Sequence, residues 1–161
     1  MIMRNIPITV IVSVKNEELN LPKCLECLSE FSEVIVVDSN SSDKTPNIVK
    51  LFGYKLINFK WNGKFPKKRN WTLENVNLKN DWVLFLDADE YLTEQFIKEV
   101  SKKISQNTHN GYWLYYNNFF MGKEQKYGLK MRKLALFKKG VGRFEQIAED
   151  NWSHLDMEIH E

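Results

Sequence analysis

Three carboxylates stand within four residues of one another in Asp87-Ala88-Asp89-Glu90. They follow Trp82–Leu86, an apolar run whose length and composition are typical of a buried strand. Since side chains alternate along an extended chain, Asp87 and Asp89 are expected to face the same side. Two such ionised groups about 5 Å apart repel by roughly 3 kcal/mol at an effective dielectric constant near 20. The pattern predicts a divalent cation that removes this repulsion. The alternative is a solvated acidic turn in which Asp89 or Thr93 caps a helix.

Basic residues gather in two segments, although the formal net charge of the chain is only +2. Five lie between Lys60 and Asn70 without an acidic residue among them, and eight lie between Lys123 and Arg143 against Glu124 alone. Such clusters indicate anionic partners, such as phosphates or an acidic surface. A solvated face would have the same composition, so the second cluster allows both interpretations.

Length and composition indicate a globular domain, since the 161 residues are 43% hydrophobic. Cys24 and Cys27 lie among leucines with the period of a buried helix face, so we expect them to pack rather than to bind metal. The lack of a disulfide framework predicts a cytoplasmic location. Residues Ile6–Val14 resemble a signal peptide only superficially, because Pro7 interrupts them and no cleavage site follows. They are predicted to contain the first strand.

The elements that must position the carboxylates alternate in type through the first 110 residues. Strands are expected at residues 8–14, 33–38, 54 or 55–59 and 81–87, and helices at 20–31, 43–52, 67–76 and 93–105. This order predicts a mostly parallel sheet with helices on both faces. The ends of its strands would bring Lys15-Asn16-Glu17, Asp38-Ser39 and Asp87-Ala88-Asp89 to one edge.

The composition changes after Gly111. Residues Tyr112–Phe120 and Leu129–Phe137 are rich in aromatic side chains and are typical of antiparallel strands added to the sheet. The loop between them is predicted to be too long for a tight hairpin. Because the chain stops directly after the strand-like Ile159-His160-Glu161, we expect it to be a truncated piece of a longer protein.

Four motifs, in this order, closely resemble glycosyltransferase family 2, whose members have the GT-A fold. They are Val12–Glu18, Val36–Thr45, Lys67–Asn70 and Leu86–Glu90. Further along, Leu134–Lys139 resembles the family's Arg-Leu-Phe strand with Ala135 inserted. Ile159-His160-Glu161 resembles the His-Glu motif of the bacterial branch that contains lipopolysaccharide-core transferases. Asn40 stands where the family often has glycine, and asparagine tolerates the left-handed backbone of such a turn.

The resemblance implies an α/β fold of the GT-A type, a mostly parallel sheet with helices on both faces and added antiparallel strands. It implies one domain in which residues 1–110 bind the nucleotide and residues 111–161 face the acceptor. The implied activity is inverting and metal-dependent: a sugar moves from a nucleotide diphosphate donor, typically UDP-linked, to a hydroxyl of a cell-envelope glycan such as lipopolysaccharide core.

The resemblance also assigns roles to residues. Asp89 would be the principal ligand of Mn²⁺ or Mg²⁺, with Asp87 toward the ribose or a metal-bound water and His160 as an additional ligand. Glu161 would be the catalytic base, with Glu149 and Asp150 as the rival pair. The donor would contact Val14, Glu17, Asp38, Lys68, Arg69, Asp87 and Ala88. Ordinary helix-terminal or surface charge is the alternative for Glu17, for the two basic residues and for both acidic candidates.

The expected partners are the nucleotide-sugar donor and a glycan or glycolipid acceptor, with no nucleic acid. The basic, aromatic segment from Tyr112 to Arg143 further predicts peripheral association with the cytoplasmic face of the inner membrane. One alternative is a nucleotide-binding fragment or scaffold without turnover. A sugar-phosphate nucleotidyltransferase would need a glycine-rich loop where Val12–Glu18 has no glycine. A phosphatase would need Gly-Thr after Asp89.

Overall fold

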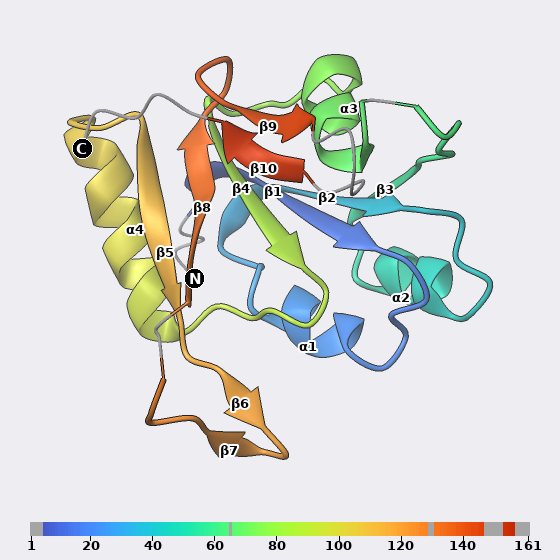
Figure 1. Cartoon of the computed structure of the whole chain (residues 1–161), viewed down its shortest axis with the longest axis horizontal. Coiled ribbons are helices and arrows are strands. Elements are labelled where there is room, and N and C mark those ends of the chain that lie inside the picture. The colour runs from blue at the N-terminus through green and yellow to red at the C-terminus, as the bar shows by residue number, and fades with distance from the viewer. Residues whose placement is uncertain (1–4, 65, 129–130, 147–152, 157–161) are drawn as a thin grey trace.

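A six-stranded sheet lies between two layers in the computed structural model, which describes residues 5–64, 66–128, 131–146 and 153–156 (Figure 1). In chain order the elements are β1 (Ile6–Val14), α1 (Leu21–Glu26), β2 (Phe31–Asp38), α2 (Thr45–Leu51), β3 (Lys55–Asn58), α3 (Lys68–Asn75), β4 (Trp82–Asp87), α4 (Glu94–Gln106), β5 (Gly111–Tyr116), β6 (Phe119–Phe120), β7 (Lys123–Glu124), β8 (Met131–Lys138), β9 (Arg143–Gln146) and β10 (Ser153–Asp156).

The strand order is β3-β2-β1-β4-β8-β5, and the first four strands in this order run parallel. Strand β8 pairs antiparallel with both β4 and β5. The predicted fold class, a mostly parallel sheet with added antiparallel strands, is confirmed. In the register of β1, Val14 lies opposite Asp38 and Ser13 lies opposite Asp87. The carboxyl ends of β1, β2 and β4 therefore meet at one edge of the sheet.

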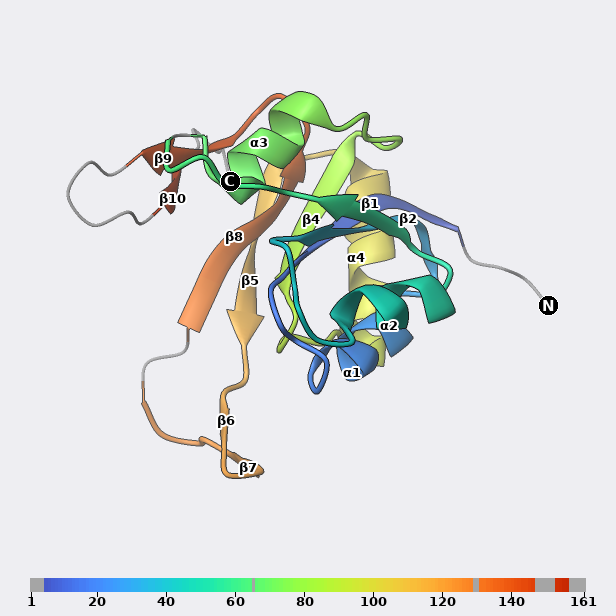
Figure 2. The same ribbon diagram turned by 90° about the vertical axis from the view of Figure 1, so that its right-hand side faces the viewer.

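Two apolar cores cover the two faces of the sheet. On one face, Val10 and Val12 of β1 pack with α1, α2 and α4, and on the other Ile11 packs with α3 and β9. Figure 2 shows α3 and β9 on the side of the sheet opposite α1, α2 and α4. Because both faces are buried, the strands are continuous apolar runs rather than alternating ones.

Helix α1 is shorter than the sequence predicts, because it ends at Glu26 instead of continuing to Phe31. Two four-residue turns follow, in which Leu28 N–H donates to the Leu25 carbonyl and Phe31 N–H donates to the Leu28 carbonyl. Strand β2 then begins at Phe31, two residues before its predicted start. The helical periodicity of Cys24 and Leu28 continues through these turns, which explains the overestimate.

The connection between β5 and β8 spans residues 117–130, so it is too long for a tight hairpin, as predicted. It contains a small hairpin of its own that the sequence analysis did not predict: the expected strand Tyr112–Phe120 is divided into β5 and β6. Phe119 pairs with Glu124 and Phe120 with Lys123, which leaves Met121 and Gly122 as a two-residue turn. Both turn residues have positive φ, 50° and 75°, as a type I′ turn requires. Methionine is not a typical residue for this position, so the sequence carried only half of the usual signal. The β6–β7 hairpin projects from the body of the molecule (Figure 2).

Helix α3 is fixed to β9 by a reciprocal pair of hydrogen bonds. Asn70 is 2% exposed, its Oδ1 accepts from the Phe144 N–H at 2.7 Å, and its Nδ2 donates to the Phe144 carbonyl. Arg69, the neighbour of Asn70, lies over the Phe144 ring at 5.0 Å. These contacts hold the first turn of α3 over the edge of the sheet. Among the described residues, no helix combines the length and apolar character of a transmembrane segment.

We expect Asn70→Ala to lower the free energy of unfolding by about 2 to 3 kcal/mol, because it leaves the buried N–H and carbonyl of Phe144 without partners. Urea denaturation followed by circular dichroism measures this loss. Asn75→Ala is the matched control, because Asn75 is an exposed asparagine of the same helix. Equal effects of the two substitutions would contradict the assignment.

Candidate active site

The loops that follow β1 and β2 are hydrogen-bonded to each other. Asn16 N–H donates to Ser41 Oγ at 2.7 Å, and Asn16 Oδ1 accepts from the Ser42 N–H at 2.8 Å. Asn16 and Asn40 have φ of 54° and 63°, the left-handed conformation that asparagine tolerates. The two strand ends therefore form one connected edge.

Asp38 is the last residue of β2 and is only 1% exposed. Both of its carboxylate oxygens accept from the Ser41 N–H, at 3.2 and 3.0 Å, and Oδ1 also accepts from the Ser41 hydroxyl. A buried carboxylate is costly unless it is hydrogen-bonded. The serine turn meets this need and fixes the carboxylate at the edge of the sheet.

Glu17 and Glu18 both contribute to the starts of helices. Glu17 Oε2 accepts from Asn20 Nδ2 at 3.0 Å, and Glu18 Oε2 accepts from the Lys44 N–H at 3.0 Å. Asn20 and Lys44 are the N-cap residues of α1 and α2. These contacts favour the structural interpretation of both glutamates.

Lys68 opens α3 and reaches across the edge to β1. Its Nζ donates to the Val14 carbonyl at 2.8 Å. Burial lowers the pKa of Lys68 to about 8, and the nearby carboxylates Asp38 and Asp87 act against this shift. Lys68 is thus a partly buried cation that releases its proton unusually easily.

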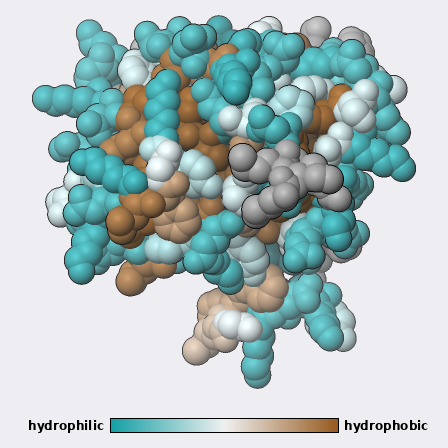
Figure 3. Space-filling model, turned by 180° about the vertical axis from the view of Figure 1, so that it is seen from behind, coloured by the Kyte–Doolittle hydropathy of each residue, from teal (hydrophilic) through white to brown (hydrophobic). Residues whose placement is uncertain are grey.

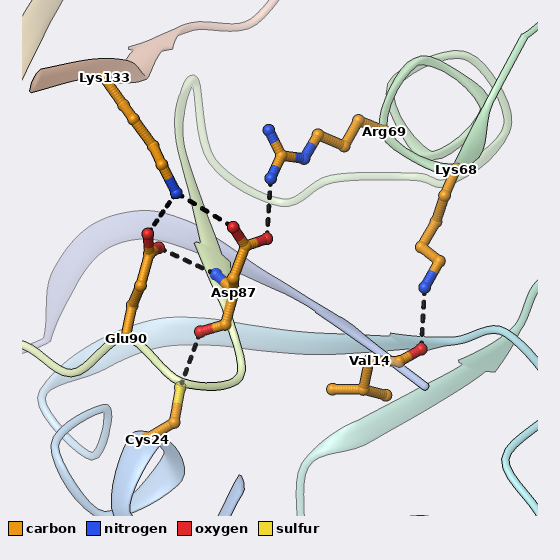
Figure 4. A network of polar contacts seen from close by, with 7 residues as sticks. All are labelled: Val14, Cys24, Lys68, Arg69, Asp87, Glu90 and Lys133. Carbon is orange, nitrogen blue, oxygen red and sulfur yellow. Dashed lines mark hydrogen bonds and ion pairs between the residues drawn. The ribbon is translucent and has the colours of Figure 1, made fainter. Parts of the chain in front are cut away.

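Asp87 lies between two cations at the end of β4 (Figure 4). Arg69 Nη2 contacts Oδ1 at 2.8 Å, and Lys133 Nζ contacts Oδ2 at 3.0 Å. Lys133 also pairs with Glu90 Oε1, while Glu90 Oε2 accepts from the Asp87 N–H at 3.0 Å. Burial alone would raise the pKa of Asp87, but Arg69 and Lys133 outweigh it and hold that pKa below its usual range.

Cys24 and Cys27 of the α1 region contact the backbone on either side of the acidic turn Asp87–Glu90. The Cys24 thiol lies 3.9 Å from the Asp87 carbonyl, and Cys27 Sγ accepts from the Leu92 N–H at 3.2 Å. Burial raises the pKa of both thiols, so the neutral form predominates. Cys24 packs in the core, as its periodicity predicts.

Asp89 differs from Asp87 in having an exposed side chain, while Ala88 between them is buried. Within the described ranges, nothing donates a hydrogen bond to the Asp89 carboxylate, and no group of three or more His, Cys, Asp or Glu side chains could hold a metal ion. Mg²⁺ and Mn²⁺ accept one or two carboxylates together with phosphate oxygens and water. A single exposed carboxylate, with phosphate oxygens and water as the remaining ligands, fits that requirement. Both oxygens of Asp87 are already engaged.

Most predicted donor contacts converge at this edge, on the ends of β1, β2 and β4 and the start of α3. The candidate base and additional ligand, Glu149, Asp150, His160 and Glu161, lie outside the described residues.

Two further residues at this edge were missed as site residues by sequence reasoning. Lys133 stood out only as a member of a basic segment, and its position follows from the pairing of β8 with β4. Its Nζ lies 5.1 Å from the centre of the Tyr116 ring. Among the described residues, Tyr116 has a buried hydroxyl without a hydrogen-bond partner. Burial, and after it the charges of Glu90 and Asp87, raise the pKa of Tyr116.

Comparison with known proteins places this site in a family context. The family described as Glycosyl transferase family 2 matches residues 9–157. An uncharacterised glycosyltransferase of Rickettsia typhi is 32% identical over 109 residues, which are 67% of this chain and 36% of that protein. The SPbeta prophage-derived glycosyltransferase SunS of Bacillus subtilis is 34% identical over 98 residues, 59% of this chain and 23% of that protein.

A solved structure shows the same fold. The crystal structure of S. aureus TarS 1–349 in complex with UDP superimposes with a TM-score of 0.55 at 29% identity, covering 65% of this chain and 33% of that one. The chain thus spans about a third of the length of this Rickettsia relative and of the TarS structure.

We expect the stability of the unsubstituted chain to rise relative to that of Lys68→Met between about pH 7 and about pH 9.5. The folded state releases the Lys68 proton near pH 8, whereas the unfolded state keeps it until about pH 10.4. In this window the unfolded state binds more protons, so the free energy of unfolding increases with pH. Urea denaturation at both pH values gives the difference. Lys60→Met, at an exposed lysine, is the control. Parallel pH profiles for the unsubstituted chain and Lys68→Met would refute the expectation.

Proposed function

The chain belongs to glycosyltransferase family 2, and from this premise we propose that it moves a sugar from a UDP-linked donor to a hydroxyl group of a glycan. Its architecture is the GT-A fold. The observation that carries the proposal is the convergence of Asp38, Lys68, Arg69 and Asp87 at the carboxyl ends of three adjacent parallel strands. Ligands of open α/β sheets bind in that crevice. The UDP bound by TarS, which is similar over 65% of this chain, supports the choice of nucleotide.

The donor would be recognised in two parts. Asp38, held by the Ser41 turn, offers a fixed acceptor to an N–H of the base. Lys68 and Arg69 supply positive charge for the diphosphate, and the planar guanidinium of Arg69 can contact two phosphate oxygens at once. Both cations already lie at the edge, on the Val14 carbonyl and on Asp87 respectively.

A divalent cation is part of this proposal. When bound, Mn²⁺ or Mg²⁺ would neutralise the diphosphate leaving group as a Lewis acid. Asp89 would hold it, because this carboxylate is exposed and carries no described contact. Asp87 would position Arg69 and Lys133. His160, the proposed additional ligand, lies outside the described residues.

We propose a single displacement with inversion. The acceptor hydroxyl forms a bond to the anomeric carbon as the bond from that carbon to the diphosphate oxygen breaks. A carboxylate takes the hydroxyl proton. The candidates for this base, Glu161 and the pair Glu149 and Asp150, lie outside the described residues.

The acceptor is proposed to be a cell-envelope glycan such as lipopolysaccharide core, on the basis of the His160-Glu161 motif. We also propose peripheral membrane association through the β6–β7 hairpin. Its apolar residues Phe120 and Met121 are 67% and 87% exposed, and Lys123 and Lys126 beside them are exposed too. Apolar and hydrophilic residues lie side by side on this projection (Figure 3). That combination suits an anionic lipid surface.

The second candidate function is UDP binding without turnover, because the chain spans 36% of its Rickettsia relative. Calorimetry combined with an assay of UDP-sugar hydrolysis separates the two functions. Binding together with release of free sugar supports the transferase, whereas binding alone supports the nucleotide-binding fragment.

We expect UDP to bind at least tenfold more tightly with Mn²⁺ than without it, since the cation offsets the diphosphate charge. Asp89→Ala is expected to abolish this Mn²⁺ dependence. Isothermal calorimetry with and without EDTA measures both affinities. Asp81→Ala is the control. It removes an exposed carboxylate just before β4, the strand that precedes Asp89, and should leave the Mn²⁺ dependence intact. An unchanged Mn²⁺ dependence in Asp89→Ala would refute the assignment of the ligand.

Replacing both Phe120 and Met121 by serine is expected to reduce co-sedimentation with phosphatidylglycerol vesicles several-fold, because the apolar tip no longer inserts. Replacing Lys123 and Lys126 by glutamine should weaken binding to these anionic vesicles and not to phosphatidylcholine. Leu51→Ser, at a side chain that is 86% exposed on α2, is the control. Vesicle binding that survives both hairpin variants, or no vesicle binding at all, would exclude this surface as a membrane contact.

A further inference from the structure

Lys133 links the acceptor-side half of the chain to the acidic turn. It lies on β8, 46 residues beyond Asp87, and its side chain is 35% exposed. Its Nζ contacts Asp87 at 3.0 Å and also pairs with Glu90, whose side chain is only 14% exposed. The face of the Tyr116 ring lies 5.1 Å away. Lys133 of β8 is thus positioned by residues of two other strands, β4 and β5, and by the turn after β4.

These contacts leave one N–H donor of the Lys133 ammonium group unused. An ammonium group has three N–H donors, and the two carboxylates accept from two of them. Its side chain is also flexible, since a lysine places a point charge on a four-carbon stem. The ammonium can therefore keep its pairing with Glu90 and still donate to a ligand that enters the crevice.

The positions of the basic side chains favour a phosphate as that ligand. Arg69 and Lys133 each take one oxygen of Asp87, so the two cations flank the end of β4 from two sides (Figure 4). Their two positive charges are balanced by Asp87 and Glu90. Lys68 of α3, whose Nζ lies on the Val14 carbonyl at the end of the adjacent strand β1, adds a third positive charge. An anion at this edge would meet all three cations.

We propose that Lys133 is a donor-binding residue, whose ammonium contacts the diphosphate of the nucleotide sugar from the side opposite Arg69. This inference rests on the proposed function, because it takes the donor site to be the edge formed by β1, β2 and β4. It adds a contribution from β8, so the donor site extends across the boundary between the two predicted halves of the chain.

A purely structural role for Lys133 makes different predictions. If Lys133 only neutralised Glu90, its loss would leave a poorly solvated carboxylate unpaired and would disturb the turn. Glu90→Gln would then restore the lost function, because a neutral amide needs no counter-charge. If Lys133 contacts the diphosphate, Glu90→Gln cannot restore binding.

The test is calorimetric titration of UDP and of uridine into the chain and its variants. Lys133→Met is expected to weaken UDP binding roughly tenfold or more, the effect of losing one charge-assisted hydrogen bond. Its affinity for uridine, which has no phosphate, should not change. The double variant Lys133→Met, Glu90→Gln should bind UDP as weakly as Lys133→Met alone. Lys138→Met, a part-buried lysine of the same strand that contacts Asn110, should bind UDP normally.

Each other outcome overturns the inference. Equal UDP affinity of Lys133→Met and the unsubstituted chain, or recovery in the double variant, would leave Lys133 without a donor contact. Equal losses for UDP and uridine would assign it to the structure of the turn. Absence of UDP binding by the unsubstituted chain would overturn the proposed function as well, so the two failures are distinguishable.

Discussion

The structure depends on the hydrogen bonding of β1 along both of its edges, to β2 and to β4. Both pairings are parallel and in a register that brings Val14, Asp38 and Asp87 to one end of the sheet. Apolar layers cover both faces of the strand, so its side chains are mostly apolar until the strand ends. The same pairing that stabilises the core therefore concentrates the polar groups that can bind a ligand.

The repulsion between carboxylates at that edge is offset chiefly by basic side chains of the protein. Asp87, which the repulsion argument assigned to a cation site, is neutralised by Arg69 and Lys133. Asp89 is exposed on the other side of the buried Ala88. The two aspartates of the motif thus have different surroundings despite their two-residue spacing, because the strand ends at Asp87 and a turn follows. The expectation that Asp87 and Asp89 face the same side assumed an extended chain, and the extended chain does not continue to Asp89.

Sequence reasoning was most successful where one local signal decides the structure. The apolar runs of β1, β2 and β4 predicted the strands and the polar residues at their ends. Thr93 caps α4, which is the role that the alternative interpretation of the acidic turn offered it. It was less successful where the structure depends on the pairing of strands that are far apart in the sequence. The contact between Lys133 and Asp87 depends on β8 lying next to β4, and no local pattern specifies that neighbour. The roles of residues 147–152 and 157–161 remain predictions from resemblance.

The Asn70 bridge makes α3 and β9 thermodynamically coupled parts. Asn70 follows the two basic residues of α3 and binds the backbone of Phe144, whose ring also meets Arg69. A ligand that holds Lys68 and Arg69 in place therefore also favours the docked position of β9. By reciprocity, whatever holds β9 strengthens the binding of that ligand by the same factor. The position of β9 is thus linked through Asn70 and Phe144 to the position of the two basic side chains at the edge of the sheet.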